Sequence, residues 1–330
     1  MKTKNKRNNK RRILILLLLM TVTAFTLVTS VFAWFTANKV VTVSEIQVNV
    51  EAQGGIQISA DGTNWKSVIG IPDLTSVNST TYTSSVNQIP SILKPVSTGK
   101  TVNTDGRMEM FLGTVTSNTD GDYILTATQS TEVEGTTGDF VAFDLFFRSD
   151  TATDLWLTTN SQVVTPDSTD TGIKNAARVG FVHLGNTAIG SPVATIQGLN
   201  AGVSSQVNIW EPNYDVHTAA GVAHARDTYG LTVTETGNAS PLAYSGVFAP
   251  IAESDNVLVG AATGTTAFVK PVTPDYSTVA GFTTKTQIFS LQQGISKIRI
   301  YMWIEGQDVD CENSASGGNT IFNLQITNEL

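Results

Sequence analysis

Apolar and polar residues alternate along much of this chain, and no long stretch repeats with the period of an amphipathic helix. Residues 298–305 give the clearest case, because Ile298, Ile300, Met302 and Ile304 fall in one phase and mainly polar or amphipathic side chains fall in the other. A period of two is that of a β-strand with one buried face. The pattern therefore predicts an all-β fold.

The other strand candidates are short and are separated by turn signals. Residues 140–148 are apolar on both faces, as expected of a central strand between two packed layers. Asp61-Gly62 predicts a hairpin turn between residues 56–60 and 65–69. We expect further strands at residues 41–50 (with a bulge near Ser44-Glu45), 107–116, 123–128, 155–159, 180–184, 207–210, 286–291 and 321–327.

Many short strands with turns between them predict a jelly-roll-like or Ig-like β-sandwich with long loop insertions. Residues 173–178 (IKNAAR) are the one segment that resembles a short helix. The stretch from about residue 185 to residue 280 is rich in Gly, Ala, Thr and Pro. We expect a loop-rich insert there, of the kind that carries partner-facing surface.

The first 33 residues differ from the rest of the chain. Seven Lys and Arg side chains precede an uncharged, mostly apolar stretch over residues 13–33, which is the organisation of an export signal. The sequence Val31-Phe32-Ala33 suits signal peptidase and predicts cleavage between Ala33 and Trp34. The alternative is an uncleaved membrane anchor, since about 20 apolar residues can span a bilayer. Either outcome leaves residues 34–330 as an extracellular domain.

The charge balance narrows the classes of partner. The leader holds seven of the 20 basic residues and none of the 28 acidic ones, so residues 34–330 carry a formal charge of −15. Nucleic-acid binding requires a basic surface and is therefore not expected. Cys311 is the single cysteine, so no intrachain disulfide can form, and stability must come from a hydrophobic core.

An acidic cluster follows directly after the strand at residues 298–305. Asp308, Asp310 and Glu312 place oxygen ligands on every second residue, like one side of a calcium loop. A solvated acidic turn is the simpler interpretation, and a Ca²⁺ site with these three residues as ligands is the alternative. Asp150 and Asp154 follow the central strand and could join them only if the fold brings the two turns together.

Motifs give no positive support for catalysis. Ser91-Ile-Leu-Lys94 and Ser254-Asp-Asn256 match two elements of the penicillin-recognising serine enzymes, but the third element, K-T-G, is missing. The flanking prolines also disfavour the helix that would join Ser91 to Lys94. We therefore expect no enzyme and no organic cofactor.

The histidines form no metal-binding pair such as H-E-x-x-H. We expect His183 to be structural, and His217 and His224 to be solvated within the loop-rich insert. A secreted hydrolase would need one of the three to meet Ser and Asp in a pocket.

At Val31-Phe-Ala-Trp-Phe-Thr36 the chain resembles the TasA/camelysin group of exported surface proteins of Gram-positive, Firmicutes-like bacteria. Phe143-Asp-Leu-Phe-Phe147, Asn175-Ala-Ala-Arg-Val179 and residues 303–311 resemble features of such surface proteins as well. The resemblance implies a jelly-roll-like sandwich, export through a dedicated signal peptidase and, in some members, polymerisation into matrix fibres by donated strands. The chain departs from the group in its middle insert and has no H-E-x-x-H to match the protease activity ascribed to camelysins.

Residues 34–50 are the segment that strand donation would use. Trp34 and Phe35 begin it, and Val41 and Val43 continue it as a β-prone stretch. Freed by cleavage, the segment could pair with an edge strand of a neighbouring copy, whereas within one subunit it would be the first strand.

These observations together favour a surface or matrix structural protein that acts by self-assembly or adhesion. The alternative is a membrane-anchored binding module for a glycan or protein ligand, with the insert as its recognition surface.

Overall fold

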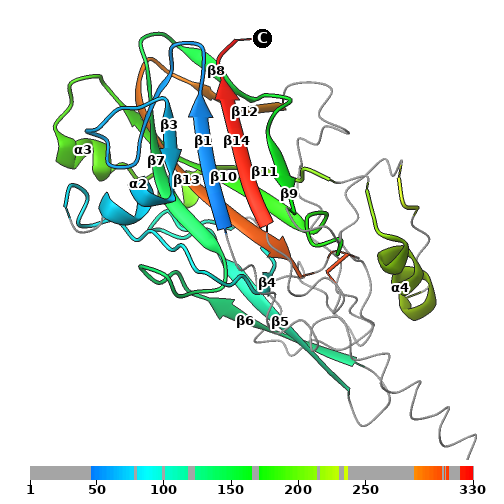
Figure 1. Ribbon diagram of the computed structural model, residues 1–330. Coiled ribbons are helices and arrows are strands. Elements are labelled where there is room, and N and C mark those ends of the chain that lie inside the picture. Colours follow the sequence, from blue (N-terminus) through cyan, green and yellow to red (C-terminus); the bar gives the residue numbers. More distant parts are fainter. Residues whose placement is uncertain are drawn as a thin grey trace, which may run out of the picture.

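The computed structural model describes residues 46–77, 80–98, 101–117, 123–165, 171–213, 216–229, 234–236, 286–306, 308, 310–311 and 320–329. Two six-stranded sheets and one two-stranded ribbon hold most of the regular structure of these residues (Figure 1). The all-β sandwich expected from the sequence is thereby confirmed. The predicted leader, the cleavage position at Ala33 and Trp34, and residues 34–45 with Phe35, Val41 and Val43 lie outside the described residues.

Sheet I has the strands that come first and last in the described chain side by side at its centre. Strand β1 (Ile46–Ala52) pairs in parallel with β14 (Thr320–Thr327) and antiparallel with β3 (Val68–Gly70). On the other side, β14 contacts β8 (Thr153–Leu157) and β9 (Gln162–Val164), and β8 pairs with β12 (Thr286–Leu291). Residues 46–50, the described end of the segment considered for strand donation, therefore belong to a strand in the sandwich of the same chain.

Sheet II is built on the longest strand, β13 (Gly294–Glu305). It lies between β10 (Ala177–Thr187) and β7 (Val141–Ser149), both antiparallel to it. The outer members are β11 (Gln206–Trp210) beside β10, β2 (Gln57–Ser59) beside β7 and the short β4 (Pro95–Val96) beside the end of β13. Every strand predicted between residues 107 and 327 is confirmed, as is the central position of β7.

The main core fills the space between the two sheets. Phe143 and Ile300 from sheet II pack in one buried cluster with Val50 and Phe322 from sheet I. The alternation of apolar side chains along each strand produces this layer, because every second side chain of a strand points to the same face.

Strand β13 is buried on both faces, which corrects the one-sided burial expected for residues 298–305. Tyr301 and Trp303, on the face away from the main core, belong to a second apolar cluster. That cluster is completed by side chains such as Val96, Met108 and Met110. Val96 belongs to β4, whereas the segment from residue 102 to residue 112 packs over sheet II as a third layer and covers Tyr301 and Trp303 of β13.

The charged side chains beneath this third layer are paired with one another. Arg299 donates to Asp144 at 2.7 Å and also forms an ion pair with Glu132. Lys297 lies 3.2 Å from Asp144 and donates to the hydroxyl of Tyr82 at 2.9 Å. All four charged groups are largely buried, so their ion pairs and hydrogen bonds replace the interactions with water that burial removes.

The predicted hairpin at Asp61-Gly62 is a turn that changes sheets. A single bridge pairs Ile58 with Lys66, after which β2 joins sheet II and β3 joins sheet I. Ser59 and the backbone N–H groups of residues 63 and 64 bind the Asp61 carboxylate, while Gly62 adopts a φ of 74°. The turn therefore closes one edge of the sandwich.

The helices are short: α2 (Ile71–Ser76), α3 (Val193–Gln197), the 3₁₀ turn η2 (Gly202–Ser204) and α4 (Ala219–Tyr229). The helix expected at residues 173–178 is wrong, because these residues form a turn that runs directly into β10. The expected insert contains α3, β11 and α4 within its described part. None of the helices among the described residues has the length and apolarity to cross a bilayer.

Candidate functional site

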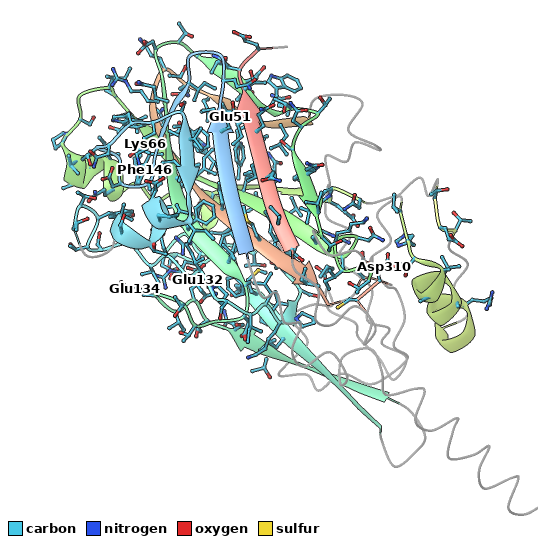
Figure 2. The ribbon with its side chains drawn as sticks, in the orientation of Figure 1. Glu51, Lys66, Glu132, Glu134, Phe146 and Asp310 are labelled. Atoms are coloured by element: carbon cyan, nitrogen blue, oxygen red, sulfur yellow. The ribbon has the colours of Figure 1, made fainter. Side chains whose placement is uncertain are left out.

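A cluster of buried charged groups lies at the end of sheet II where β13 finishes. Arg178 comes from the first residues of β10 and Glu211 from just after β11. Asp308 and Asp310 belong to the turn after β13, and His217 precedes α4. Figure 2 shows Asp310 between the sandwich and α4. The cluster therefore joins the two largest strands to the inserted segment.

Arg178 is the central cation of this cluster. Its guanidinium donates to Asp308 at 2.6 Å and forms an ion pair with Glu211, and all three side chains are almost completely inaccessible to solvent. It also donates to the carbonyl oxygens of Asn175 and Ala177 at 2.9 and 3.0 Å. Burial of an arginine is tolerated when its donors are used in this way.

Asp310 fixes the imidazole of His217. One carboxylate oxygen lies 2.7 Å from His217 Nδ1, and the other accepts hydrogen bonds from the backbone N–H and the hydroxyl of Thr218, both at 2.8 Å. The backbone N–H of Asp310 in turn donates to Asp308 at 2.8 Å. The turn after β13 thus holds both carboxylates in place against His217.

Burial and neighbouring charges shift the pKa values of the cluster. Burial and, to a smaller extent, the charge of Asp308 raise the pKa of Glu211 to about 8, against the opposing effect of Arg178. Burial likewise raises the pKa of Asp308, again opposed by Arg178. Burial acts to lower the pKa of His217, but the hydrogen bond to Asp310 and the charge of Asp308 outweigh it and raise the pKa. These shifts favour the neutral form of the Glu211 carboxyl and the charged form of the His217 imidazole, so both reduce the excess of negative charge in the cluster.

Two of the three predicted calcium ligands are brought together. Asp308 and Asp310 are adjacent and buried, so the expected solvated acidic turn is wrong for this pair. Glu312 lies outside the described residues, and the calcium site stays a prediction. Asp150 and Asp154 follow β7, whose end pairs with the beginning of β13. They are therefore at the opposite end of the sheet.

His217 is the site residue that the sequence did not reveal. It was expected to be solvated, and that expectation is wrong, since only 4% of its surface is exposed. Its partner Asp310 is 93 residues away in the chain. His183 does have a structural setting, with its ring centroid 5.5 Å from that of Phe289.

The residues tested for serine chemistry are used otherwise. Ser91 and Lys94 belong to no helix, and Lys94 forms an ion pair with Asp139 at 2.5 Å. Residues 254–256 lie outside the described residues. Within the described part of the chain, no hydroxyl group is hydrogen-bonded to His217 Nε2.

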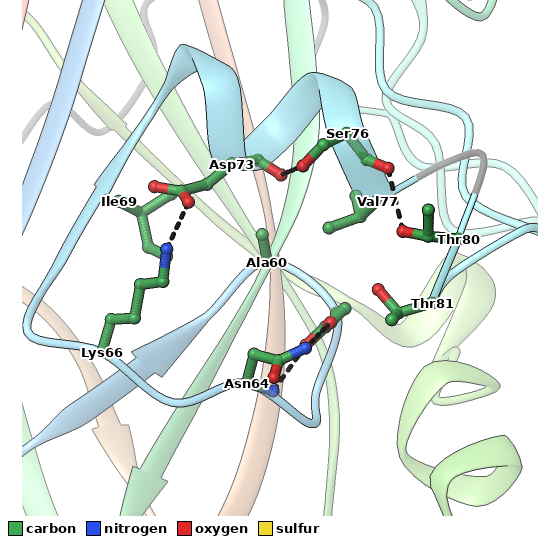
Figure 3. Close-up of a pocket in the computed structure, with 10 residues that line it drawn as sticks. Ala60, Asn64, Lys66, Ile69, Asp73, Ser76, Val77, Thr80 and Thr81 are labelled. Atoms are coloured by element: carbon green, nitrogen blue, oxygen red, sulfur yellow. Dashed lines mark hydrogen bonds and ion pairs between the residues drawn. The ribbon is translucent and has the colours of Figure 1, made fainter.

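A separate polar pocket of about 290 Å³ lies beside the Asp61 turn (Figure 3). Lys66 and Asp73 form an ion pair on one side, and Asn64 donates to Asp61 at 2.6 Å on the other. Thr80 and Thr81 line the side of the pocket opposite Lys66. Burial opposes ionisation of Asp61, but its hydrogen bonds outweigh this and hold its pKa well below the usual range, so the pocket keeps a negative charge.

No protein-family model matches this chain, and comparison with curated proteins and with solved structures finds no similar protein.

Proposed function

We propose that this chain is an exported cell-surface or matrix structural protein that acts by assembly or adhesion through the edges of its β-sheets. The observation that supports the proposal is the ribbon formed by β5 (Met110–Ser117) and β6 (Tyr123–Ser130). Figure 1 shows this ribbon continuing beyond the end of the two large sheets.

The ribbon is regular and uncharged. Eight consecutive residue pairs join its strands, from Met110 with Ser130 to Ser117 with Tyr123, without a shift in register. Neither strand contains Lys, Arg, Asp, Glu or Pro. Among the described residues, the outer edge of β5 is met only at Phe111, by Ser97, and no strand pairs with the outer edge of β6.

Such an edge is unusual in a soluble protein. Natural sheets normally block exposed edges with charges, prolines or bulges, because unpaired N–H and C=O groups attract further strands. A two-stranded ribbon is also marginally stable alone. At eight residues, the ribbon offers about 26 Å of edge to a strand from a second copy or a partner. The predicted export leader and the resemblance to the TasA/camelysin group fit the same function.

The first test is made on protein recovered from the cell surface. We expect intact mass and N-terminal sequencing to give a start at Trp34, and electron microscopy of the same sample to show filaments or ordered oligomers. Isolated monomers that retain Met1 would contradict the proposal.

A matched pair of variants tests the role of the ribbon. Thr126→Lys places a charge in the middle of β6, whereas Thr195→Lys places the same charge on the exposed surface of α3. We expect Thr126→Lys to abolish assembly in light scattering and Thr195→Lys to assemble like the unchanged chain. Equal assembly by both variants would show that the ribbon is not the contact.

The alternative function, an anchored binding module, is favoured by the pocket beside Asp61. Its hydroxyl, amide and carboxylate groups are those that recognise the hydroxyl groups of a saccharide. This alternative predicts a monomer whose Asp61→Asn variant loses binding to an immobilised saccharide that the unchanged chain retains. Retention of filaments together with no saccharide binding would exclude it.

A further inference from the structure

We propose that a second copy of this chain pairs with the free edge of β6, antiparallel to it, about a two-fold axis at Thr126. This inference rests on the proposed function, since it takes assembly through sheet edges as its premise and identifies the partner. Strand β6 pairs with β5 on one side, and no strand of the described residues pairs with it on the other. The contact would join two ribbons into one four-stranded sheet.

A bridge at the base of the ribbon shows which backbone groups point outward. The N–H of Phe111 donates to the carbonyl oxygen of Ser97 at 2.8 Å, and the carbonyl oxygen of Phe111 accepts from the N–H of Ser97 at 2.9 Å. Both hydrogen-bonding groups of Phe111 are therefore turned away from β6. Gln129 lies opposite Phe111 in the ribbon, so its own groups are turned away from β5.

The other outward groups of β6 follow from this position, because the hydrogen-bonding groups of successive residues point to opposite edges of a strand. The residues with outward groups are Tyr123, Leu125, Ala127 and Gln129. An axis at Thr126 brings Tyr123 opposite Gln129 of the second copy, and Leu125 opposite Ala127. This register uses the full length of the strand and forms four hydrogen-bonded pairs, with about eight backbone hydrogen bonds.

The two faces of the ribbon favour the antiparallel arrangement. The register places residues 115, 123, 125 and 127 on one face, and these positions are apolar in the sequence. The opposite face has threonine at positions 114, 116, 126 and 128. A two-fold axis perpendicular to the sheet keeps the apolar positions of both copies on one face, whereas a two-fold axis along the strands would place them on opposite faces. A two-stranded ribbon becomes more stable when further strands extend a hydrophobic face.

Strand β6 is also a place where two acidic chains can meet. Residues 34–330 carry a formal charge of −15, but β6 contains no charged residue. Like charges directly opposite each other on paired strands are destabilising, and pairing β6 with itself brings none together. Because each copy offers the same edge to the other, the contact closes on itself and gives a dimer. Growth into a filament would need a second contact at another edge.

The first test exchanges charges at position 126 in the protein recovered from the cell surface. Thr126→Lys alone and Thr126→Glu alone should dimerise more weakly than the unchanged chain in analytical ultracentrifugation at low salt. An equal mixture should form a mixed dimer at least about tenfold tighter than either variant alone, because lysine then lies opposite glutamate. The control mixes Thr195→Lys with Thr195→Glu, both changed on the exposed surface of α3, and should dimerise like the unchanged chain.

A disulfide tests the register without adding a charge. Directly opposite residues in a non-hydrogen-bonded pair have Cα atoms about 4.5 Å apart, which a disulfide can bridge. Thr126→Cys should therefore give a disulfide-linked dimer on a non-reducing gel after mild oxidation. Gln129→Cys is the control, since the axis places the two copies of this residue about 20 Å apart. Cys311 is buried, so the unchanged chain should give no linked dimer.

The outcomes separate this contact from the function on which it rests. Rescue by mixing, together with a disulfide at position 126, supports both. Charge variants that lose assembly without rescue, or a disulfide from Gln129→Cys but not from Thr126→Cys, would overturn the two-fold contact and leave assembly through the ribbon in place. Charge variants that pair like the unchanged chain would overturn the contact as well. An unchanged chain that stays monomeric would overturn both the contact and the proposed function.

Discussion

Replacing Arg299 by methionine should destabilise the protein strongly, because the change leaves two buried carboxylates without their main partner. Arg299 is about 4% exposed and pairs with both Asp144 and Glu132, which are 5% and 2% exposed. Breaking a buried ion pair by removing one partner costs about 3–5 kcal/mol. Asp144 would still pair with Lys297, and Glu132 with Arg107, so we expect a loss within this range and not above it. Methionine keeps much of the apolar volume, so the loss reports mainly on charge and hydrogen bonding.

The measurement is the free energy of unfolding from urea denaturation, together with Tm. A loss of about 4 kcal/mol should lower Tm by roughly 10 °C in a domain of this size. Lys66→Met is the matched control, because Lys66 is 48% exposed in its ion pair with Asp73. An exposed pair contributes at most about 1 kcal/mol.

The comparison between the two variants decides the argument. If Arg299→Met costs no more than Lys66→Met, the charges beneath the third layer are not a stabilising network, and water must reach them. If the cost is large, Glu132→Gln in the Arg299→Met background should recover part of it, since Glu132 then has only the partly exposed Arg107 as a paired cation among the described residues.

Two further predictions concern acid stability and the turn between the sheets. Burial opposes ionisation of Asp144, but the charges of Arg299 and Lys297 outweigh it and lower its pKa to about 2. Ionised Asp144 should therefore contribute about 2 kcal/mol to the free energy of unfolding above its ordinary pKa near 4, and this contribution should disappear as the pH falls through about 2. Unfolding measurements between pH 5 and 2 should show a smaller loss of stability with falling pH in Asp144→Asn than in the unchanged chain. Gly62→Ala should cost about 1–3 kcal/mol, because φ is 74° and the added Cβ would lie 2.8 Å from a methyl carbon of Ile196. Gly55→Ala, at a φ of 82° with no atom within 4 Å of the added Cβ, should cost less by urea denaturation, and equal losses would show that the contact with Ile196 relaxes freely.

The strands were predictable because side-chain alternation is a local property. Residues 298–305 carry a period of two and residues 140–148 a nearly continuous apolar run, both local patterns, and both segments are central strands of sheet II. The burial of Arg299 and Trp303 was not predictable from the same residues. Trp303 is covered by the third layer, and Arg299 is held by Glu132 and the carbonyl oxygen of Val86, and all of these come from distant parts of the sequence.

The helix expected at residues 173–178 failed for a related reason. Its two alanines and two basic residues favour a helix locally. The backbone N–H of Asn175 instead donates to the carbonyl of Gly172, which has a φ of 85°. At the beginning of β10, Arg178 forms ion pairs with Glu211 and Asp308. These tertiary interactions override the local preference for a helix.

The buried charged cluster around Arg178 could be predicted only in part. The turn after β13 places Asp308 and Asp310 two residues apart, so their proximity was visible in the sequence. Arg178 and Asp308 are 130 residues apart, and His217 comes from a segment with no strand period. Long-range pairs of this kind leave no local signal.

The parallel pairing of β1 with β14 fixes when sheet I can form. Gln325 of β14 donates a hydrogen bond to Glu51 of β1, which is 274 residues away in the chain. Strand β14 also pairs with β8 and β9. Contacts of such long range form slowly, because the loop between them must close first. A chain emerging from the ribosome therefore keeps its earliest strand without its central neighbour until residue 327 has been synthesised.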